Sequence, residues 1–229
     1  MKNILILGCS YSCGSSGLLT EDTQKSDVLV NKKGWWYFVD YFKNNDVTVI
    51  GFPAQGYWAY YQILLYFQEI NLLIYVEIWI QETLEPRPTI NNYKNVLLKF
   101  NKPPEIINET FKYYRIYNVH ILKLHAKNCK EENKPYSLWE SFFNEITKSC
   151  AQNIDKLCAE KNIKGYVWSM YGPIMKCNHF NRLPLTYIRH ELKNNNLLVL
   201  GDHPGLHQTE KGNKYISKLI DKACIDMKI

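Results

Sequence analysis

The feature that most constrains this chain is a series of short apolar runs that alternate with stretches of helical periodicity. Residues 4–7 are all apolar and stop at Gly8, which is typical of a buried strand that runs into a loop. Residues 47–50, 72–80 and 165–169 form further apolar runs of strand length. Strands that alternate with helices predict an α/β fold, a three-layer α/β/α sandwich around a central parallel sheet.

Four segments between and after these strands are predicted helices. Residues 35–42 and 57–67 combine aromatic and aliphatic side chains. A long helix is expected to begin near Ser137, a suitable N-cap with a glutamate three residues later. Its apolar residues recur every three or four positions, which indicates one buried face. A last amphipathic helix is expected from about Thr209.

The chain length of 229 residues fits one domain, and we expect a single domain over residues 1–229. Residues 84–135 are expected to be an irregular insertion in it. The first part of this segment contains several asparagines and four prolines, which disfavour regular helices and strands. The prolines are Pro86, Pro88, Pro103 and Pro104.

The composition excludes several classes of protein. A hydrophobic content of 46% argues against a disordered chain. The net charge of +6 arises from lysines spread along the chain, whereas nucleic-acid-binding proteins cluster them, so no nucleic-acid partner is expected. The N-terminal apolar run is too short for a signal peptide or a membrane span. Seven cysteines at irregular spacing are typical of reduced thiols without a zinc site, and we expect a cytoplasmic protein.

The loop after the first strand is the expected place for chemistry, because open parallel sheets bind ligands beyond the carboxyl ends of their strands. Ser10 follows this strand, near backbone N–H groups that can stabilise an oxyanion. A serine hydroxyl becomes a good nucleophile only when a base takes its proton. The best candidates are His203 and His207, shortly before the expected helix cap Thr209. Asp202 can hold either imidazole in the required tautomer.

Two segments of the N-terminal quarter carry a resemblance to a known family. Residues 8–14, Gly-Cys-Ser-Tyr-Ser-Cys-Gly, resemble the first block of SGNH (GDSL-like) hydrolases. By this resemblance Ser10 is the nucleophile, and Cys9 stands where the family normally has aspartate. Residues 51–56, Gly-Phe-Pro-Ala-Gln-Gly, resemble the second block, whose glycine N–H donates to the oxyanion. That match implies Gly56 as an oxyanion donor.

The third block of the family is Gly-x-Asn after a strand, and residues 78–83 contain neither glycine nor asparagine. Gln81 is the residue that can supply an amide donor there. Loss of one oxyanion donor typically raises the reaction barrier by ~3 kcal/mol, so this position matters for activity.

The fifth block is normally Asp-x-x-His-Pro, with a glycine five residues after the histidine and then an amphipathic helix. His207 fits the downstream half, because Gly212 follows it by five residues. His203 fits the upstream half through its neighbours Asp202 and Pro204. We favour His207 as the base and keep His203 as the alternative, with Asp202 as the orienting acid in either case.

The resemblance implies a flavodoxin-like SGNH hydrolase fold and a serine esterase that needs neither a metal nor an organic cofactor. The implied substrate is a small-molecule or glycan ester, with an acyl or acetyl group on a carbohydrate or lipid-like molecule. The residues in the implied roles are Ser10, Asp202 and His207 or His203 for the triad, and Ser10, Gly56 and Gln81 for the oxyanion hole. The alternative is a non-catalytic SGNH-like module that binds a glycan or a protein. The sequence does not indicate an oligomeric state.

Three further features have alternative interpretations. Tryptophans in the two early helices are either core residues or a surface that stacks on a sugar ring; these are Trp35, Trp36 and Trp58. Three glutamates near the third strand are expected in a solvated loop rather than as the carboxylate pair of a glycosidase. These are Glu77, Glu82 and Glu85. Residues 8–14 lack the Gly-x-Gly-x-x-Gly pattern and a Walker lysine, which argues against nucleotide binding.

Overall fold

A central parallel sheet organises the computed structural model, which describes residues 1–9, 12, 34–51, 56–69, 74–82, 95–99, 105–107, 137–173, 175–185, 187–198 and 208–229. Five strands of the described sheet are mutually parallel, in the order β2-β1-β3-β6-β7. They are β1 (Asn3–Gly8), β2 (Asp46–Gly51), β3 (Glu77–Glu82), β6 (Lys164–Ser169) and β7 (Asn181–Arg182). The predicted α/β class with a central parallel sheet is confirmed.

The order of the parallel strands locates the crevice of the sheet. Counted in chain order they run 2-1-3-4-5, which is the order of flavodoxin-like doubly wound sheets. The chain passes from β1 to β2 on one side and then returns to β3 on the other side of β1. Ligands of such sheets bind at this switch point, outside the carboxyl ends of the strands. The carboxyl ends of β1 and β3 are therefore the place to look for a site.

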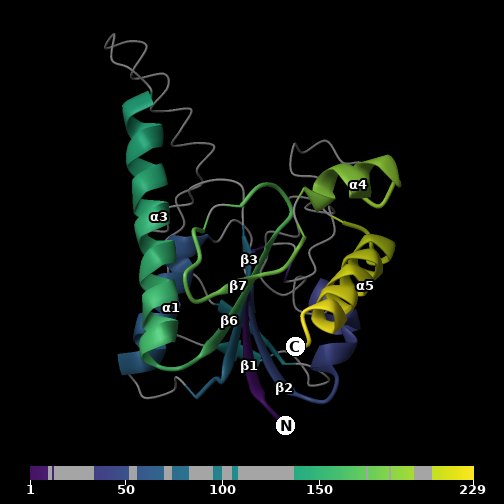
Figure 1. Ribbon diagram of the computed structural model, residues 1–229, viewed down its shortest axis with the longest axis horizontal. Helices are drawn as coiled ribbons and strands as arrows, with labels where there is room; N and C mark the ends of the chain where they lie inside the picture. Colours follow the sequence, from purple (N-terminus) through teal and green to yellow (C-terminus); the bar gives the residue numbers. More distant parts are fainter. Residues whose placement is uncertain are drawn as a thin grey trace.

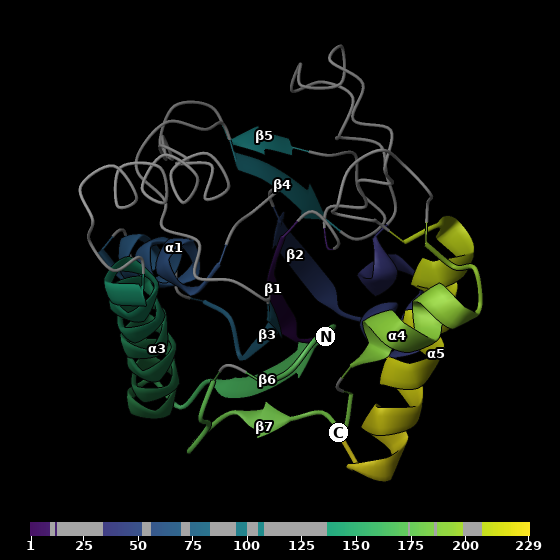
Figure 2. The same cartoon turned by 90° about the horizontal axis from the view of Figure 1, so that it is seen from above.

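Helices lie against both faces of the sheet, as Figures 1 and 2 show. On one face, α1 (Tyr57–Glu69) and the long α3 (Ser137–Glu160) pack against each other. On the other face lie α5 (Glu210–Asp226) and two short 3₁₀ helices, η3 (Trp35–Phe38) and η4 (Asp40–Phe42).

The alternation of side chains along β1 explains how both faces are buried. Ile4 and Ile6 belong to the apolar cluster that contains η3, η4 and α5, whereas Leu5 and Leu7 belong to the cluster with α1 and α3. All four side chains are fully buried. A strand that is apolar at every position is what a parallel sheet covered on both faces requires.

Helix α5 runs against the direction of the strands. Its last turns lie at the amino edge of the sheet, because Asp221 accepts a hydrogen bond of 2.8 Å from the backbone N–H of Asp40, just before β2. The first turn of α5 therefore lies towards the carboxyl edge (Figure 1). Thr209 is its N-cap, and the Thr209 side chain accepts a hydrogen bond of 3.0 Å from the N–H of Gly212. The predicted start of the last helix is confirmed.

The structure corrects two predicted elements. Residues 35–42 do not form one helix, because Val39 has an extended backbone between η3 and η4. The two short helices, with the extended Val39 between them, bury Trp35, Trp36, Val39 and Phe42. The third strand begins at Glu77 and not at residue 72, and Ile74 and Val76 before it are about half exposed.

The segment predicted as an irregular insertion contains regular structure. Within residues 84–135, β4 (Asn95–Lys99) pairs antiparallel with β2, and β5 (Glu105–Ile107) pairs antiparallel with β4. These two strands extend the described sheet to seven strands. A further helix, α4 (Ile188–Asn194), precedes α5.

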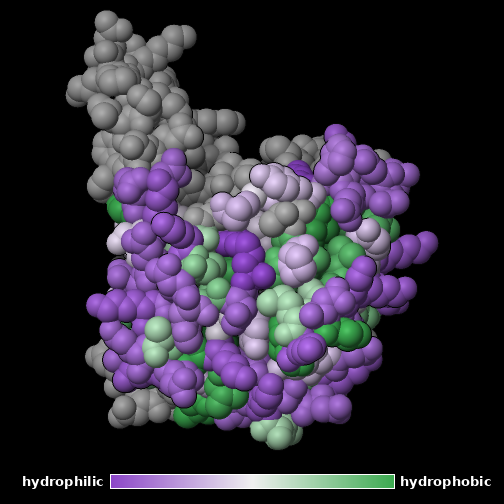
Figure 3. Space-filling view, in the orientation of Figure 1, coloured by the Kyte–Doolittle hydropathy of each residue, from purple (hydrophilic) through white to green (hydrophobic). Residues whose placement is uncertain are grey.

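The surface agrees with this burial pattern. Hydrophilic side chains cover the outer side of α3, and apolar side chains reach the surface mainly on the side of α4 and α5 (Figure 3). In the part of the chain that the structure describes, no helix combines the length and the apolar character needed to cross a bilayer.

Candidate functional site

The structure describes two of the six predicted site residues. Gly56 lies immediately before α1, and Gln81 is the last but one residue of β3. Ser10, Asp202, His203 and His207 lie outside the described residues. The geometry of the site is therefore built from the described residues that flank them in the sequence and in space.

Gln81 lies at the switch point with its side chain on the same face as η3. It stands opposite Trp168 of β6 in the strand register, and it is fully buried. Its Oε1 atom accepts a hydrogen bond of 2.5 Å from the hydroxyl of Ser12 and one of 3.3 Å from the indole N–H of Trp35. The same indole N–H is 3.1 Å from the Ser12 Oγ, so these three side chains form one buried array.

The Nε2 atom of Gln81 forms no such bond. It is buried, and no group among the described residues accepts a hydrogen bond from it. A buried amide N–H without a partner costs about 1–3 kcal/mol, so native structures rarely keep one without a reason. A group of this kind at the carboxyl edge can donate to a ligand.

Ser12 is fixed in place from several sides. Its backbone N–H donates to the Cys9 carbonyl over 2.9 Å, and its own carbonyl accepts a hydrogen bond of 2.6 Å from the indole of Trp36. A Cβ atom on Gly8 would lie 1.9 Å from the Ser12 Oγ, so glycine at position 8 leaves the space that this hydroxyl fills. Ser12 lies two positions after the predicted nucleophile. It is therefore fixed by hydrogen bonds to Cys9 and to Trp36.

The segment that carries both histidines is also held at its two ends. Leu198 pairs with Gln208 in an isolated antiparallel bridge. The N–H of Thr209 donates to the Leu197 carbonyl over 2.8 Å, and the Thr209 hydroxyl donates to the same oxygen over 3.1 Å. Gly212 packs on this carbonyl, because a Cβ there would lie 2.6 Å from it. These contacts give a reason for the glycine five residues after His207.

Helix η3 contacts segments that lie near the two ends of the sequence. It packs against α5, and the ammonium of Lys214, in the second turn of α5, lies 5.3 Å from the centre of the Phe38 ring. The first residue of η3 is Trp35, which bonds to Ser12 and Gln81. Lys214 of α5, Ser12 after β1 and Gln81 near the end of β3 therefore all contact this one 3₁₀ helix.

The first turn of α1 lies on the opposite face of the same strand ends. The hydroxyl of Tyr60 is 3.5 Å from the backbone oxygen of Gln81, and the hydroxyl of Tyr57 donates to Glu82 over 2.7 Å. Gly56, directly before this turn, is buried and its carbonyl accepts from the N–H of Tyr60. Free N–H groups at a helix start favour negative charge.

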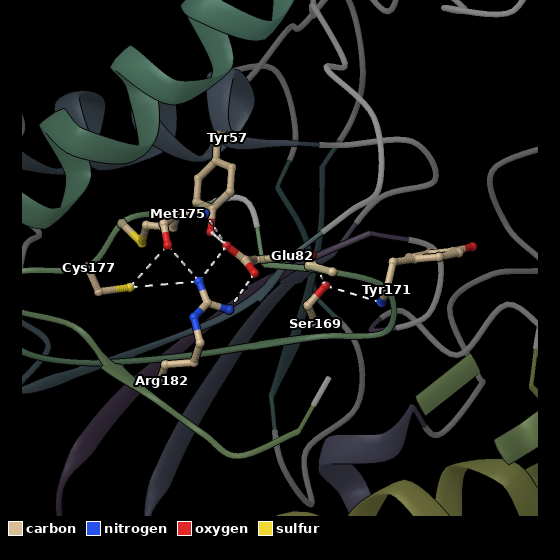
Figure 4. A network of polar contacts seen from close by, with 8 residues as sticks. Tyr57, Glu82, Ser169, Tyr171, Met175, Cys177 and Arg182 are labelled. Atoms are coloured by element: carbon tan, nitrogen blue, oxygen red, sulfur yellow. Dashed lines mark hydrogen bonds and ion pairs between the residues drawn. The ribbon is translucent and has the colours of Figure 1, made fainter. Parts of the chain in front are cut away.

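An ion pair lies beside the carboxyl end of β3, as Figure 4 shows. Arg182 of β7 makes a two-pronged contact with the Glu82 carboxylate, over 2.7 and 3.1 Å. Glu82 also accepts a hydrogen bond of 2.6 Å from the N–H of Met175, and Arg182 donates to the Met175 carbonyl over 2.8 Å. Glu82 is buried and not in a solvated loop, so that prediction was wrong.

Burial and the ion pair shift the pKa values of the neighbouring groups. Burial and the adjacent carboxylate of Glu82 raise the pKa of Tyr57 well above its usual value, so this phenol stays protonated and acts as a donor. Burial raises the pKa of the Cys177 thiol to about 11, although Arg182 acts in the opposite direction. Burial alone would lower the pKa of Arg182, but its bonds to Glu82 outweigh that effect and raise it. The groups around Glu82 thus remain in one protonation state at neutral pH.

The geometry bears on two alternative interpretations of the sequence. Glu77 and Glu82 occupy opposite ends of β3, and Glu77 binds Lys2 over 2.6 Å at the amino edge, so these two cannot act as a carboxylate pair. Glu85 lies outside the described residues. Trp35 and Trp36 are core residues with no exposed ring face for a sugar, and Trp58 is half-buried against the α1 and α3 cluster.

Sequence reasoning missed Ser12, Trp35 and Arg182 as parts of this edge. Ser12 lies within the segment that resembles the first SGNH block, so its position there was an available signal. Arg182 is 100 residues away from Glu82, and no local pattern links the two. Within the described ranges, no group of histidine, cysteine, aspartate and glutamate side chains could hold a metal ion. Compared with protein-family models, curated proteins and solved structures, the chain gives no match.

Proposed function

We propose that this protein is a serine hydrolase that cleaves acyl or acetyl esters of a carbohydrate or lipid-like molecule, at the carboxyl edge of β1 and β3. In this proposal Ser10 attacks the ester carbonyl and His207, or His203, accepts its proton. Asp202 orients the imidazole, and the oxyanion accepts hydrogen bonds from Ser10, Gly56 and Gln81. The proposal needs no metal and no organic cofactor.

The observation that carries the proposal is the double contact of Trp35 with Ser12 and Gln81, on a helix that also packs against the start of α5. Ser10 is two residues before Ser12, and His207 is two residues before Thr209, the cap of α5. Ser12, two residues after the proposed nucleophile, and Lys214, seven residues after His207, both contact this 3₁₀ helix. A serine hydroxyl and an imidazole must share a proton, so this proximity is the first requirement of the mechanism.

Two further features support the proposal. The start of α1 and the amide of Gln81 offer donors at the edge where charge would develop, and donors of this kind stabilise an oxyanion. Cys150, Cys158, Cys177 and Cys224 are thiols, which agrees with the cytoplasmic location that we include in the proposal.

Hydrolysis of p-nitrophenyl acetate and butyrate by the purified chain tests the proposal. Ser10→Ala should lower kcat by on the order of 10⁴-fold or more, because removal of a triad nucleophile removes most of the rate enhancement. Ser217→Ala, which removes a buried serine hydroxyl on α5, should leave kcat unchanged. Turnover by the Ser10 variant equal to that of the parent chain would refute the proposal.

The same assay distinguishes the two histidines. His207→Ala should remove activity as completely as Ser10→Ala, and His203→Ala should retain at least a tenth of it. The reverse result would assign the base to His203. If neither variant loses activity, the proposed triad is wrong. A parent chain that binds glycans and hydrolyses no ester would favour the non-catalytic module instead.

A further inference from the structure

The side-chain amide of Gln81 has two different ends. Its oxygen faces two donors, the Ser12 hydroxyl at 2.5 Å and the Trp35 indole N–H at 3.3 Å. Its nitrogen has no acceptor among the described residues, although the whole residue is buried. A buried N–H without an acceptor is costly, so an interaction must hold the amide in this orientation rather than in the flipped one.

Trp35 prevents a flip of this amide, which would exchange its oxygen and its nitrogen. An indole N–H can only donate, so an amide nitrogen in the place of Oε1 would put donor against donor. Ser12 by itself would not prevent this, because a hydroxyl can donate or accept. The Ser12 oxygen accepts from Trp35 over 3.1 Å and donates its proton to the oxygen of Gln81 over 2.5 Å. The indole of Trp35, which can only donate, is therefore the group that fixes the direction of the amide.

We propose that Trp35 and Ser12 are positioning residues that hold the Gln81 amide with its Nε2 ready to donate to the oxyanion. This inference rests on the proposed ester hydrolysis. As the Ser10 oxygen bonds to the carbonyl carbon, the π electrons of the carbonyl move to its oxygen, and the serine proton passes to the histidine. Gln81 forms no covalent bond and loses no proton. Its free N–H is already oriented when the charge develops, so no group has to rotate during the reaction.

A double-mutant cycle tests this role. Gln81→Glu keeps an oxygen for both donors and removes the amide N–H, and it should lower kcat by about 100-fold. Trp35→Phe keeps an aromatic ring in the core and frees the amide to turn over, and it should lower kcat by roughly tenfold at a KM within about twofold of the parent. In the Gln81→Glu background, Trp35→Phe should lower kcat by less than about twofold, because its effect acts through the amide.

Trp168→Phe is the matched control. Trp168 is equally buried, contacts Trp35 edge to face at 5.1 Å, and has an indole N–H with no partner among the described residues. Its replacement makes a similar cavity in the same cluster and should leave kcat within about twofold. If Gln81→Glu does not fold, as judged by circular dichroism, Gln81→Met takes its place in the cycle.

The outcomes separate the two levels of the proposal. Full turnover by Ser10→Ala would overturn the esterase itself. Loss of turnover in Ser10→Ala together with additive effects of Trp35→Phe and Gln81→Glu, or with equal effects of Trp35→Phe and Trp168→Phe, would overturn only the positioning role.

Discussion

Replacement of Arg182 by methionine should destabilise the protein by about 3 kcal/mol. The substitution keeps most of the side-chain volume and removes the two-pronged contact with Glu82, whose side chain is 0% exposed. Removal of one partner of a buried ion pair costs roughly 3–5 kcal/mol, because the other charge stays buried and unpaired. The lower end applies here, since Tyr57 and Met175 still donate to Glu82 and the arginine is 24% exposed.

Urea unfolding followed by tryptophan fluorescence measures this loss. With an m-value of roughly 3 kcal/mol/M, the midpoint should fall by about 1 M. Lys148→Met, which breaks a surface pair with Glu145, should change stability by less than about 0.5 kcal/mol. In a Glu82→Gln background, Arg182→Met should cost at most half as much, because no unpaired charge remains. A loss below about 1 kcal/mol for Arg182→Met would refute the reasoning.

Three further predictions follow from single residues. Gly8→Ala should destabilise the protein by about 1–3 kcal/mol in urea unfolding, because its Cβ would overlap the Ser12 side chain, whereas Gly172→Ala, with its nearest atom at 3.2 Å, should cost less than about 1 kcal/mol. Equal losses would contradict this. Thr209→Ala should cost about 1 kcal/mol through loss of the α5 cap, and Thr209→Ser should restore it. Because the pKa of Cys177 is raised to about 11, its alkylation by iodoacetamide should speed up about tenfold per pH unit between pH 8 and 10; a plateau below pH 9, seen by peptide mass spectrometry, would argue against this environment.

The fold was predictable where the sequence pattern is local. The apolar run of residues 4–7 gave a strand, and the spacing of Cys150, Ile154 and Leu157 gave a helix with one buried face, as observed in α3. The cap at Thr209 fixed the start of α5. These signals depend on periodicity and capping within a few residues, which a single sequence contains.

Other parts of the fold depend on partners that are distant in the sequence. β4 and β5 lie in a segment whose prolines and asparagines suggest irregular chain, and they become strands by pairing beside β2. β7 is only two residues long, too short to give an alternating pattern. The break at Val39 was not predictable from the apolar spacing, because residues 35, 39 and 42 would also share one face of a continuous α-helix.

The candidate site likewise has parts that local sequence patterns predict and parts that depend on distant partners. Gly56 and Gln81 were predicted as donors from motif order along the chain; Gly56 lies directly before α1 and Gln81 near the end of β3. The direction in which the Gln81 amide points was not predictable, because it depends on a tryptophan 46 residues earlier. The burial of Glu82 likewise depends on Arg182, since a carboxylate becomes buried only when a distant partner compensates its charge.

The two outer strands of the sheet have a consequence for self-association. The described sheet ends in β5, three residues long, at one side and in β7, two residues long, at the other. A strand from a second molecule needs a long row of free backbone N–H and C=O groups to add to a sheet. Such short margins offer few of them, so they protect the protein against fibre formation by continuous β-pairing. The described edges therefore favour neither fibres nor dimers that form by continuous pairing of strands.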